Sequence, residues 1–143
     1  LDEAYASQGT RLYPGDARRR ATVRRIVSEV DGYTSEATDA LIEELLYVKP
    51  EARDAARLEK ARAGVADEFA FLARYLEADF LAGPLSAADF ALYPYVAFLD
   101  RCHQRVPTFD AERLLTPALA AWKRRVEALP YFGETYPPHW RAA

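Results

Sequence analysis

Two pairs of residues in this chain have types and a spacing that could support chemistry. Ser86 precedes Asp89 by three residues, and Cys102 stands directly before His103. A serine or cysteine becomes a nucleophile when a base such as histidine lies within hydrogen-bonding distance. Ser86 and Asp89 have no histidine near them in the sequence, and adjacent residues of a helix do not face each other. We therefore expect both pairs to serve packing or capping and not catalysis.

Ser86 and Asp89 instead match the start of a helix. Gly83-Pro84 breaks the preceding run, because glycine tolerates a left-handed cap and proline cannot continue a helix. The Ser86 hydroxyl is predicted to accept from the amide of Asp89, and the Asp89 carboxylate from the amide of Ser86, as in a capping box. Leu85 and Phe90 occupy the two positions of a hydrophobic staple, which fixes the angle of entry into the helix.

The helix that follows this cap is predicted to be the buried centre of an all-α domain. It runs from Ala87 to about Gln104, with Pro94 inside it as a bend. A helix with apolar residues on every side is usually enclosed by other elements. Its large apolar residues are Phe90, Leu92, Tyr93, Tyr95, Val96, Phe98 and Leu99.

Three further helices are expected around this central one. Helical periodicity and an Asp16 cap predict a first long helix to about Val48, in which Gly32 marks a bend or a close helix contact. A second long helix is predicted from about Glu51 to Asp79, antiparallel to the first. Thr116 is the predicted cap of the last helix, with Pro117 at its first position. The aromatic, proline-rich tail is expected to lie over the body of the domain.

The composition limits the classes of partner. With 143 residues the chain suits one domain, and 19 basic against 22 acidic residues give no reason to expect binding to nucleic acid or an anionic membrane. No apolar run approaches the roughly 20 residues that span a bilayer. A lone Cys102 cannot form an internal disulfide and fits a reducing compartment. One cysteine with His103 and His139 offers no metal-ligand spacing, so no metal is expected.

Two stretches of the sequence resemble the C-terminal domain of the glutathione transferase family. Leu81 to Pro94 is similar to its capping box and staple, and Thr116 to Pro130, around Trp122, is similar to its next helix. The resemblance implies an all-α bundle with two long antiparallel helices and a buried central capped helix. It also implies that residues 1–15 are the end of a preceding thioredoxin-like domain and its linker, and that residues 16–143 are the helical domain. Because the chain lacks an initial methionine, we expect it to be a piece or product of a longer protein.

The resemblance implies a function as well. Family members add the thiolate of glutathione, a co-substrate bound mainly by the thioredoxin-like half, to apolar electrophilic small molecules. The helical half supplies the wall of the electrophile pocket and, through its long first and second helices, much of a homodimer interface. A cytoplasmic location follows from the same resemblance. We expect no thiol-activating residue in this chain and no transferase activity from it alone.

Within the helical half, Tyr33, Leu41 and Trp140 are the candidates for lining the electrophile pocket. Ordinary core or rim positions are an equally good interpretation of all three, because helical stripes usually belong to the core. The arginines at positions 18–20, 24 and 25 are interpreted as a solvated face, or as interface or cleft residues. A second function also fits the motifs, since transferase-like helical domains serve as non-catalytic assembly modules in translation-factor and synthetase complexes. A preceding thioredoxin-like domain with a Tyr, Ser or Cys near its start would favour the enzyme.

Overall fold

The first long helix is built from four consecutive segments. The computed structural model, which describes residues 2–5 and 7–140, gives α1 (Ala17–Glu29), a π-helical turn η1 (Val30–Thr34), α2 (Ser35–Ile42) and a second π-helical turn η2 (Glu43–Tyr47). The Asp16 carboxylate accepts from the amide of Arg19, which confirms the predicted cap, and the end at Tyr47 agrees with the predicted end near Val48.

The π-helical turns were not predicted. Next to η1, the hydroxyls of Ser35 and Thr38 donate to the carbonyls of Asp31 and Thr34, a local competition with the helical ladder that bends helices. Gly32 lies within η1, and a Cβ added there would meet nothing within 4 Å. Its position fits the predicted bend and rules out the alternative of a close helix contact.

The second long helix is shorter than predicted. After the 3-10 turn η3 (Pro50–Ala52), α3 spans Ala55–Ala73 and begins where the Asp54 carboxylate accepts from two backbone amides. The expected continuation to Asp79 is wrong, because a two-stranded hairpin follows, β1 (Leu76–Glu77) and β2 (Phe80–Leu81), paired antiparallel. Ala78 and Ala82 both have φ in the left-handed region, which a continuing helix does not allow.

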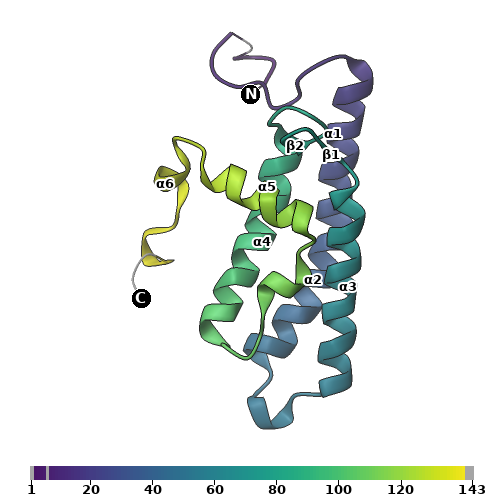
Figure 1. Cartoon of the computed structure of the whole chain (residues 1–143), viewed down its shortest axis with the longest axis vertical. Helices are drawn as coiled ribbons and strands as arrows, with labels where there is room; N and C mark the ends of the chain where they lie inside the picture. Colours follow the sequence, from purple (N-terminus) through teal and green to yellow (C-terminus); the bar gives the residue numbers. More distant parts are fainter. Residues whose placement is uncertain (1, 6, 141–143) are drawn as a thin grey trace.

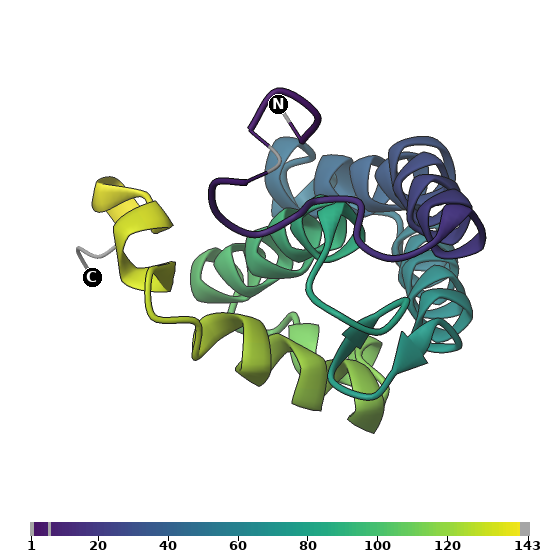
Figure 2. The same ribbon diagram turned by 90° about the horizontal axis from the view of Figure 1, so that it is seen from above.

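Helix α4 (Ala87–Arg105) lies in the middle of the bundle, between the first long helix and the C-terminal elements (Figures 1 and 2). Its inner side is buried, as predicted, and contributes Leu92, Val96, Leu99 and Cys102 to the core. One side of α4 is not enclosed, however, and Phe90 remains 38% exposed. The prediction of a helix covered on all sides is therefore right for the core and wrong for this open face.

The C-terminal elements complete the core and then leave it. The 3-10 turn η4 (Ala111–Leu114) leads to α5 (Pro117–Glu127), whose predicted Thr116 cap accepts from the amide of Leu119. Trp122 of α5 is fully buried, with Phe69 and Phe109 among the largest core side chains. Beyond α5, the chain forms α6 (Phe132–Thr135) and the 3-10 turn η5 (Pro138–Trp140), which stand beside α4 at the left of Figure 1.

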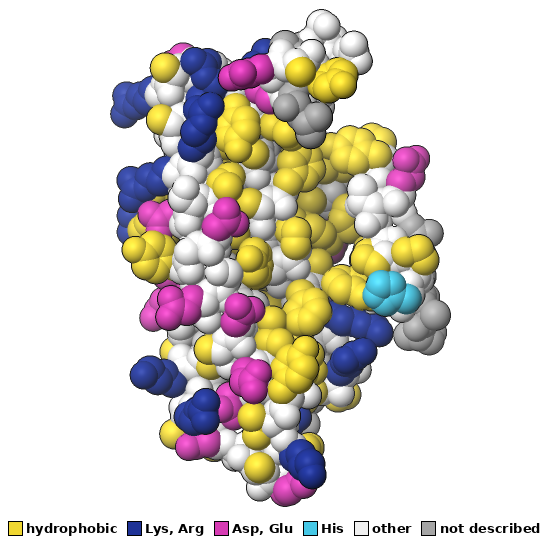
Figure 3. Space-filling view, turned by 180° about the vertical axis from the view of Figure 1, so that it is seen from behind, with side chains coloured by type: hydrophobic (Ala, Val, Ile, Leu, Met, Phe, Trp, Pro, Cys, Tyr) yellow, Lys and Arg dark blue, Asp and Glu magenta, His cyan; other side chains and the backbone are white. Residues whose placement is uncertain are grey.

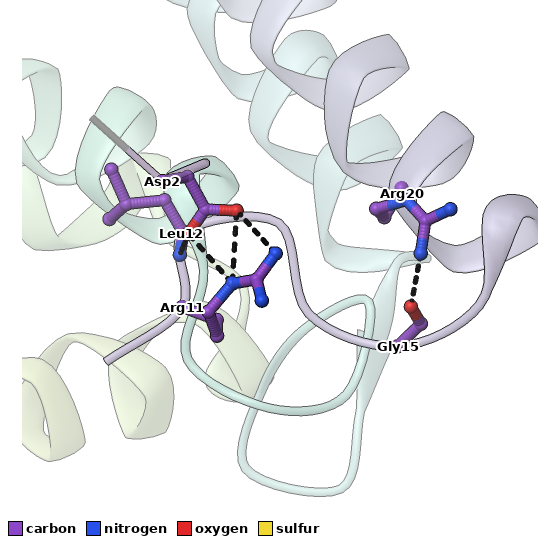
Figure 4. A network of polar contacts seen from close by, with 5 residues as sticks. All are labelled: Asp2, Arg11, Leu12, Gly15 and Arg20. Carbon is purple, nitrogen blue, oxygen red and sulfur yellow. Dashed lines mark hydrogen bonds and ion pairs between the residues drawn. The ribbon is translucent and has the colours of Figure 1, made fainter. Parts of the chain in front are cut away.

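The N-terminal segment crosses one end of the bundle and is fixed there by polar contacts (Figure 4). The Asp2 carboxylate accepts from the guanidinium of Arg11 at 3.2 Å and from the amide of Leu12 at 2.6 Å. The Leu12 carbonyl in turn accepts from the amide of Ala87 at 2.8 Å, which ties this segment to the start of α4. Arg20 donates to the carbonyl of Gly15 at 2.6 Å and holds the turn before α1.

Candidate functional site

Asp89 lies at a buried junction of three elements. Its Oδ1 accepts from the amide of Leu81 at 2.9 Å and from the Trp122 indole at 2.8 Å, and its Oδ2 accepts from the amide of Ser86 at 2.9 Å. The Ser86 hydroxyl donates to the same oxygen at 3.3 Å. Burial raises the pKa of the Asp89 carboxyl, and the four donated hydrogen bonds oppose that rise. This carboxylate joins the hairpin, the α4 cap and α5, so its role is structural.

Neither Ser86 nor Cys102, the two possible nucleophiles, lies in surroundings that would activate it. Ser86 is fully buried, its hydroxyl accepts from the amide of Ala88, and both halves of the predicted capping box with Asp89 are present. Cys102 is fully buried, and burial raises the pKa of its thiol to about 11. The exposed His103 pairs through Nδ1 with the carbonyl of Phe109.

Two classes of site have no counterpart in the structure of residues 2–5 and 7–140. No group of three or more His, Cys, Asp or Glu side chains in this range could hold a metal ion. In the same part of the chain, no helix is both long enough and apolar enough to cross a bilayer.

A cleft of about 330 Å³ opens between α4 and the C-terminal segment; we call it the apolar cleft. Aromatic side chains form most of its outer wall. The rings of Tyr93 and Phe132 meet edge to face at 5.4 Å, and those of Tyr136 and Trp140 at 5.9 Å. The cleft is lined by Phe90, Tyr93, Pro94, Ala97, Val126, Leu129, Tyr131, Phe132, Thr135, Tyr136, Pro137 and Trp140.

The one hydroxyl that α4 contributes to the apolar cleft is already engaged. Tyr93 donates to Glu127 Oε1 at 3.1 Å, and burial together with the Glu127 carboxylate raises its pKa. Lys123 Nζ lies 2.8 Å from Glu127 and 2.9 Å from Asp100. Burial alone would lower the pKa of Lys123, but these two carboxylates outweigh it and raise the pKa. The polar groups behind the wall are thus paired with one another, which leaves an apolar surface toward the cleft.

A second depression lies across α4 from the first; we call it the acidic groove. It has a volume of about 490 Å³ and runs between α2–η2 and α4. Pro94 lines both depressions, and Phe98 of the groove meets Trp140 of the cleft with ring centroids 6.2 Å apart. The groove is lined by Thr38, Asp39, Ile42, Glu43, Tyr47, Pro94, Tyr95 and Phe98. Figure 3 shows apolar side chains covering the middle of the face turned toward the viewer, with acidic side chains along one border.

The three residues predicted to line an electrophile pocket are not brought into one cleft. Trp140 lines the apolar cleft, Tyr33 is 63% exposed on η1, and Leu41 is fully buried in the core. Binding by these residues stays a prediction. Sequence reasoning missed the other aromatic walls of both depressions. A usable signal was present, because Phe132, Tyr136 and Trp140 recur at intervals of four, the spacing of one helical face.

Comparison with known proteins identifies the fold and the family. A family model described as glutathione S-transferase, C-terminal domain, matches residues 38–130. Among solved structures, the chain is similar to a glutathione transferase Omega 3C from Trametes versicolor, with a TM-score of 0.75 and 20% identity over 94% of this chain and 57% of that one. It is also similar to a possible glutathione S-transferase from Rhodopseudomonas palustris, with a TM-score of 0.66 and 29% identity over 98% and 64%.

A further similar structure is the glutathione S-transferase from Methylobacillus flagellatus, solved with glutathione bound. It has a TM-score of 0.65 and 25% identity over 90% of this chain and 61% of that one. The chain therefore spans about three-fifths of the length of these solved structures. A search of curated proteins gave no match. The all-α fold, with its two long antiparallel helices and central capped helix, is confirmed.

Proposed function

The chain belongs to the glutathione S-transferase family through its C-terminal domain, and from this premise we propose that it forms the electrophile-binding half of an enzyme that conjugates glutathione to apolar small molecules. The observation that carries the proposal is the apolar cleft. Small-molecule sites are typically concave, mostly apolar and lined by aromatic side chains. The cleft has this character, since Tyr93, Phe132 and Trp140 form its walls.

The rest of the catalytic machinery is proposed to lie outside these residues. A Methylobacillus flagellatus transferase of similar fold was solved with glutathione bound, and this chain spans 61% of its length. We propose that glutathione is the co-substrate here too, that a preceding thioredoxin-like domain binds it and activates its thiol, and that residues 1–15 are the end of that domain and its linker. A homodimer formed through the first long helix and α3, in the cytoplasm, completes the proposal.

The test uses the native protein that contains this domain. Glutathione conjugation to 1-chloro-2,4-dinitrobenzene is measured for the parent protein and for Phe132→Ala, with the exposed neighbour Glu134→Ala as the matched control. Because Phe132 forms the cleft wall, we expect its truncation to raise KM for the electrophile about tenfold, at the lower end of the selectivity lost with apolar pocket contacts. KM for glutathione should stay unchanged. Equal effects of the two variants, or a parallel rise in both KM values, would contradict this assignment of the cleft.

Two further measurements separate the enzyme from a stand-alone assembly module. Glutathione titrated into this chain in a calorimeter should give no heat of binding, and saturable binding would place the glutathione site here instead. An antibody against the chain should detect a native protein larger by about one thioredoxin-like domain. A band near 16.1 kDa would favour the non-catalytic assembly module.

A further inference from the structure

The side-chain charges of the first long helix have the same direction as its dipole, positive toward the N-terminus and negative toward the C-terminus. Residues 17–25 contain five arginines and no acid, whereas residues 26–48 contain no lysine or arginine and six acids, namely Glu29, Asp31, Glu36, Asp39, Glu43 and Glu44. Cations stabilise a helix near its C-terminus and anions near its N-terminus. The charge order therefore opposes helix stability at both ends. A sequence that breaks a local rule in this way often does so at a functional site.

Two of these acids line the acidic groove without a partner. Asp39 and Glu43 are exposed and stand four residues apart, so their like charges repel each other. Neither has a hydrogen bond or ion pair within residues 2–5 and 7–140. By contrast, Glu29 pairs with Arg25 at 3.5 Å and Glu44 with Arg57 at 3.0 Å. The carboxylates at the groove are thus the ones left available to a ligand.

The charges of the facing helix do not neutralise the groove. On α4, the Asp100 carboxylate is taken by Lys123, and the Arg101 guanidinium donates to Gln104 at 2.7 Å. Neither Asp100 nor Arg101 lines the groove. The ionisable carboxyl groups that line the depression are those of Asp39 and Glu43, so it presents negative charge.

The remaining lining residues favour a cation that also carries apolar groups. Tyr95 and Phe98 of α4 and Tyr47 of η2, which is 73% exposed, present aromatic rings in the same depression as the two carboxylates. The faces of aromatic rings attract cations, and quaternary or protonated amines are the ligands that use this attraction together with apolar contact. The volume of about 490 Å³ is also in the range of small-molecule sites.

We propose that the acidic groove binds an organic cation, a protonated or quaternary amine attached to an apolar body. The apolar cleft adjoins the groove at Pro94 and across the Phe98–Trp140 contact, so one amphipathic molecule reaches both depressions. If the proposed transferase function holds, this molecule is the electrophile that is conjugated to glutathione. Binding of the cation by the groove does not depend on that function.

The experiment is a binding titration of the chain, without glutathione, followed by ¹H–¹⁵N NMR. Three probes share one body and differ in charge: 4-phenylbutylammonium, 4-phenylbutanol and 4-phenylbutyrate. We expect the ammonium to bind about tenfold more tightly than the alcohol and the butyrate to bind most weakly. Shifts should concentrate on the groove residues, and the preference should shrink at high salt because exposed charges are screened.

Matched variants make the result specific to the groove. Asp39→Asn/Glu43→Gln should abolish the preference for the ammonium and leave the alcohol unchanged. Asp31→Asn/Glu36→Gln removes two exposed acids of the same helix that do not line the groove, and should preserve the preference. Equal binding of ammonium and alcohol by the parent chain, or equal losses in both variants, would overturn the proposal. Because no glutathione is present, a failed conjugation assay and a failed cation titration are independent outcomes.

Discussion

Asp89 lies on α4 and Asp39 on α2, the two helices that border the acidic groove, and the two carboxylates have opposite roles. Asp89 is fully buried and accepts four hydrogen bonds from three elements. Asp39 is exposed at the acidic groove, four residues from another carboxylate. Burying a charge without partners costs far more than leaving it in water, so the satisfied carboxylate belongs to the fold. The comparison teaches that an acid with every lone pair engaged supports architecture, whereas one kept unpaired against local repulsion is available for binding.

The largest test of this contrast is Asp89→Ala. It leaves the amides of Leu81 and Ser86 and the indole of Trp122 buried without their acceptor, and each such donor costs about 1–3 kcal/mol. We expect the free energy of unfolding to fall by about 4 kcal/mol, measured by urea denaturation. Asp39→Ala is the matched control and should change it by less than about 0.5 kcal/mol. Similar losses in the two variants would erase the distinction between the two aspartates.

Trp122→Phe removes one donor from Asp89 and keeps most of the aromatic volume. The indole hydrogen bond is 2.8 Å long and goes to a buried carboxylate, so we expect a loss of about 1.5–3 kcal/mol. Thermal unfolding followed by far-UV circular dichroism measures it. In the double variant with Asp89→Ala, the effects should be strongly non-additive because the two residues share one contact. Simple additivity would show that Trp122 acts through packing alone.

Ser86→Ala has a smaller expected effect, about 1 kcal/mol, because it removes the side-chain acceptor of the Ala88 amide but leaves the Asp89 carboxylate in place. Urea denaturation is again the measurement. Ser86→Asn, which keeps a capping acceptor, should separate the loss of the cap from the packing of this fully buried position. A neutral Ser86→Ala would mean that the Asp89 half of the capping box is sufficient.

The variant with the smallest expected effect should stabilise the protein, in contrast to those above. Glu43→Gln removes one of two like charges at i,i+4 spacing and an anion near the C-terminal end of the first long helix, so we expect stability at pH 7 to rise by about 0.2–0.5 kcal/mol. Replicate urea denaturation at low ionic strength resolves it, and the gain should disappear at high salt. A loss of stability would indicate that Glu43 has a structural partner and would weaken its assignment to ligand binding.

Short-range signals predicted most of the fold. The caps at Asp16, Ser86 and Thr116 are each determined by neighbours within three residues, and all three appear in the structure. The contact between Asp89 and Trp122 spans 33 residues, so no local pattern contains it. The hairpin at residues 76–81 was missed for a related reason, since its Leu81 amide is held by Asp89 of the next helix.

The candidate site was less predictable than the fold. Leu41 and Tyr33 both belong to the first long helix, and helical periodicity alone does not say which apolar residues other elements will cover. Leu41 is enclosed in the core, while Tyr33 on a π-helical turn points to solvent. The walls of both depressions come from segments up to about 100 residues apart in the chain, from Thr38 to Trp140. Such a surface exists only after the elements are packed.

Because Cys102 is buried in the central helix, its thiol can be used to measure transient opening of the core. A thiol that is fully buried, with a pKa of about 11, reacts with an alkylating reagent only while α4 is transiently uncovered. The rate of that reaction therefore counts openings of the core, with no label introduced into the chain. If a ligand bound in the apolar cleft or the acidic groove slows this alkylation, ligand binding beside α4 is coupled to the opening of the core.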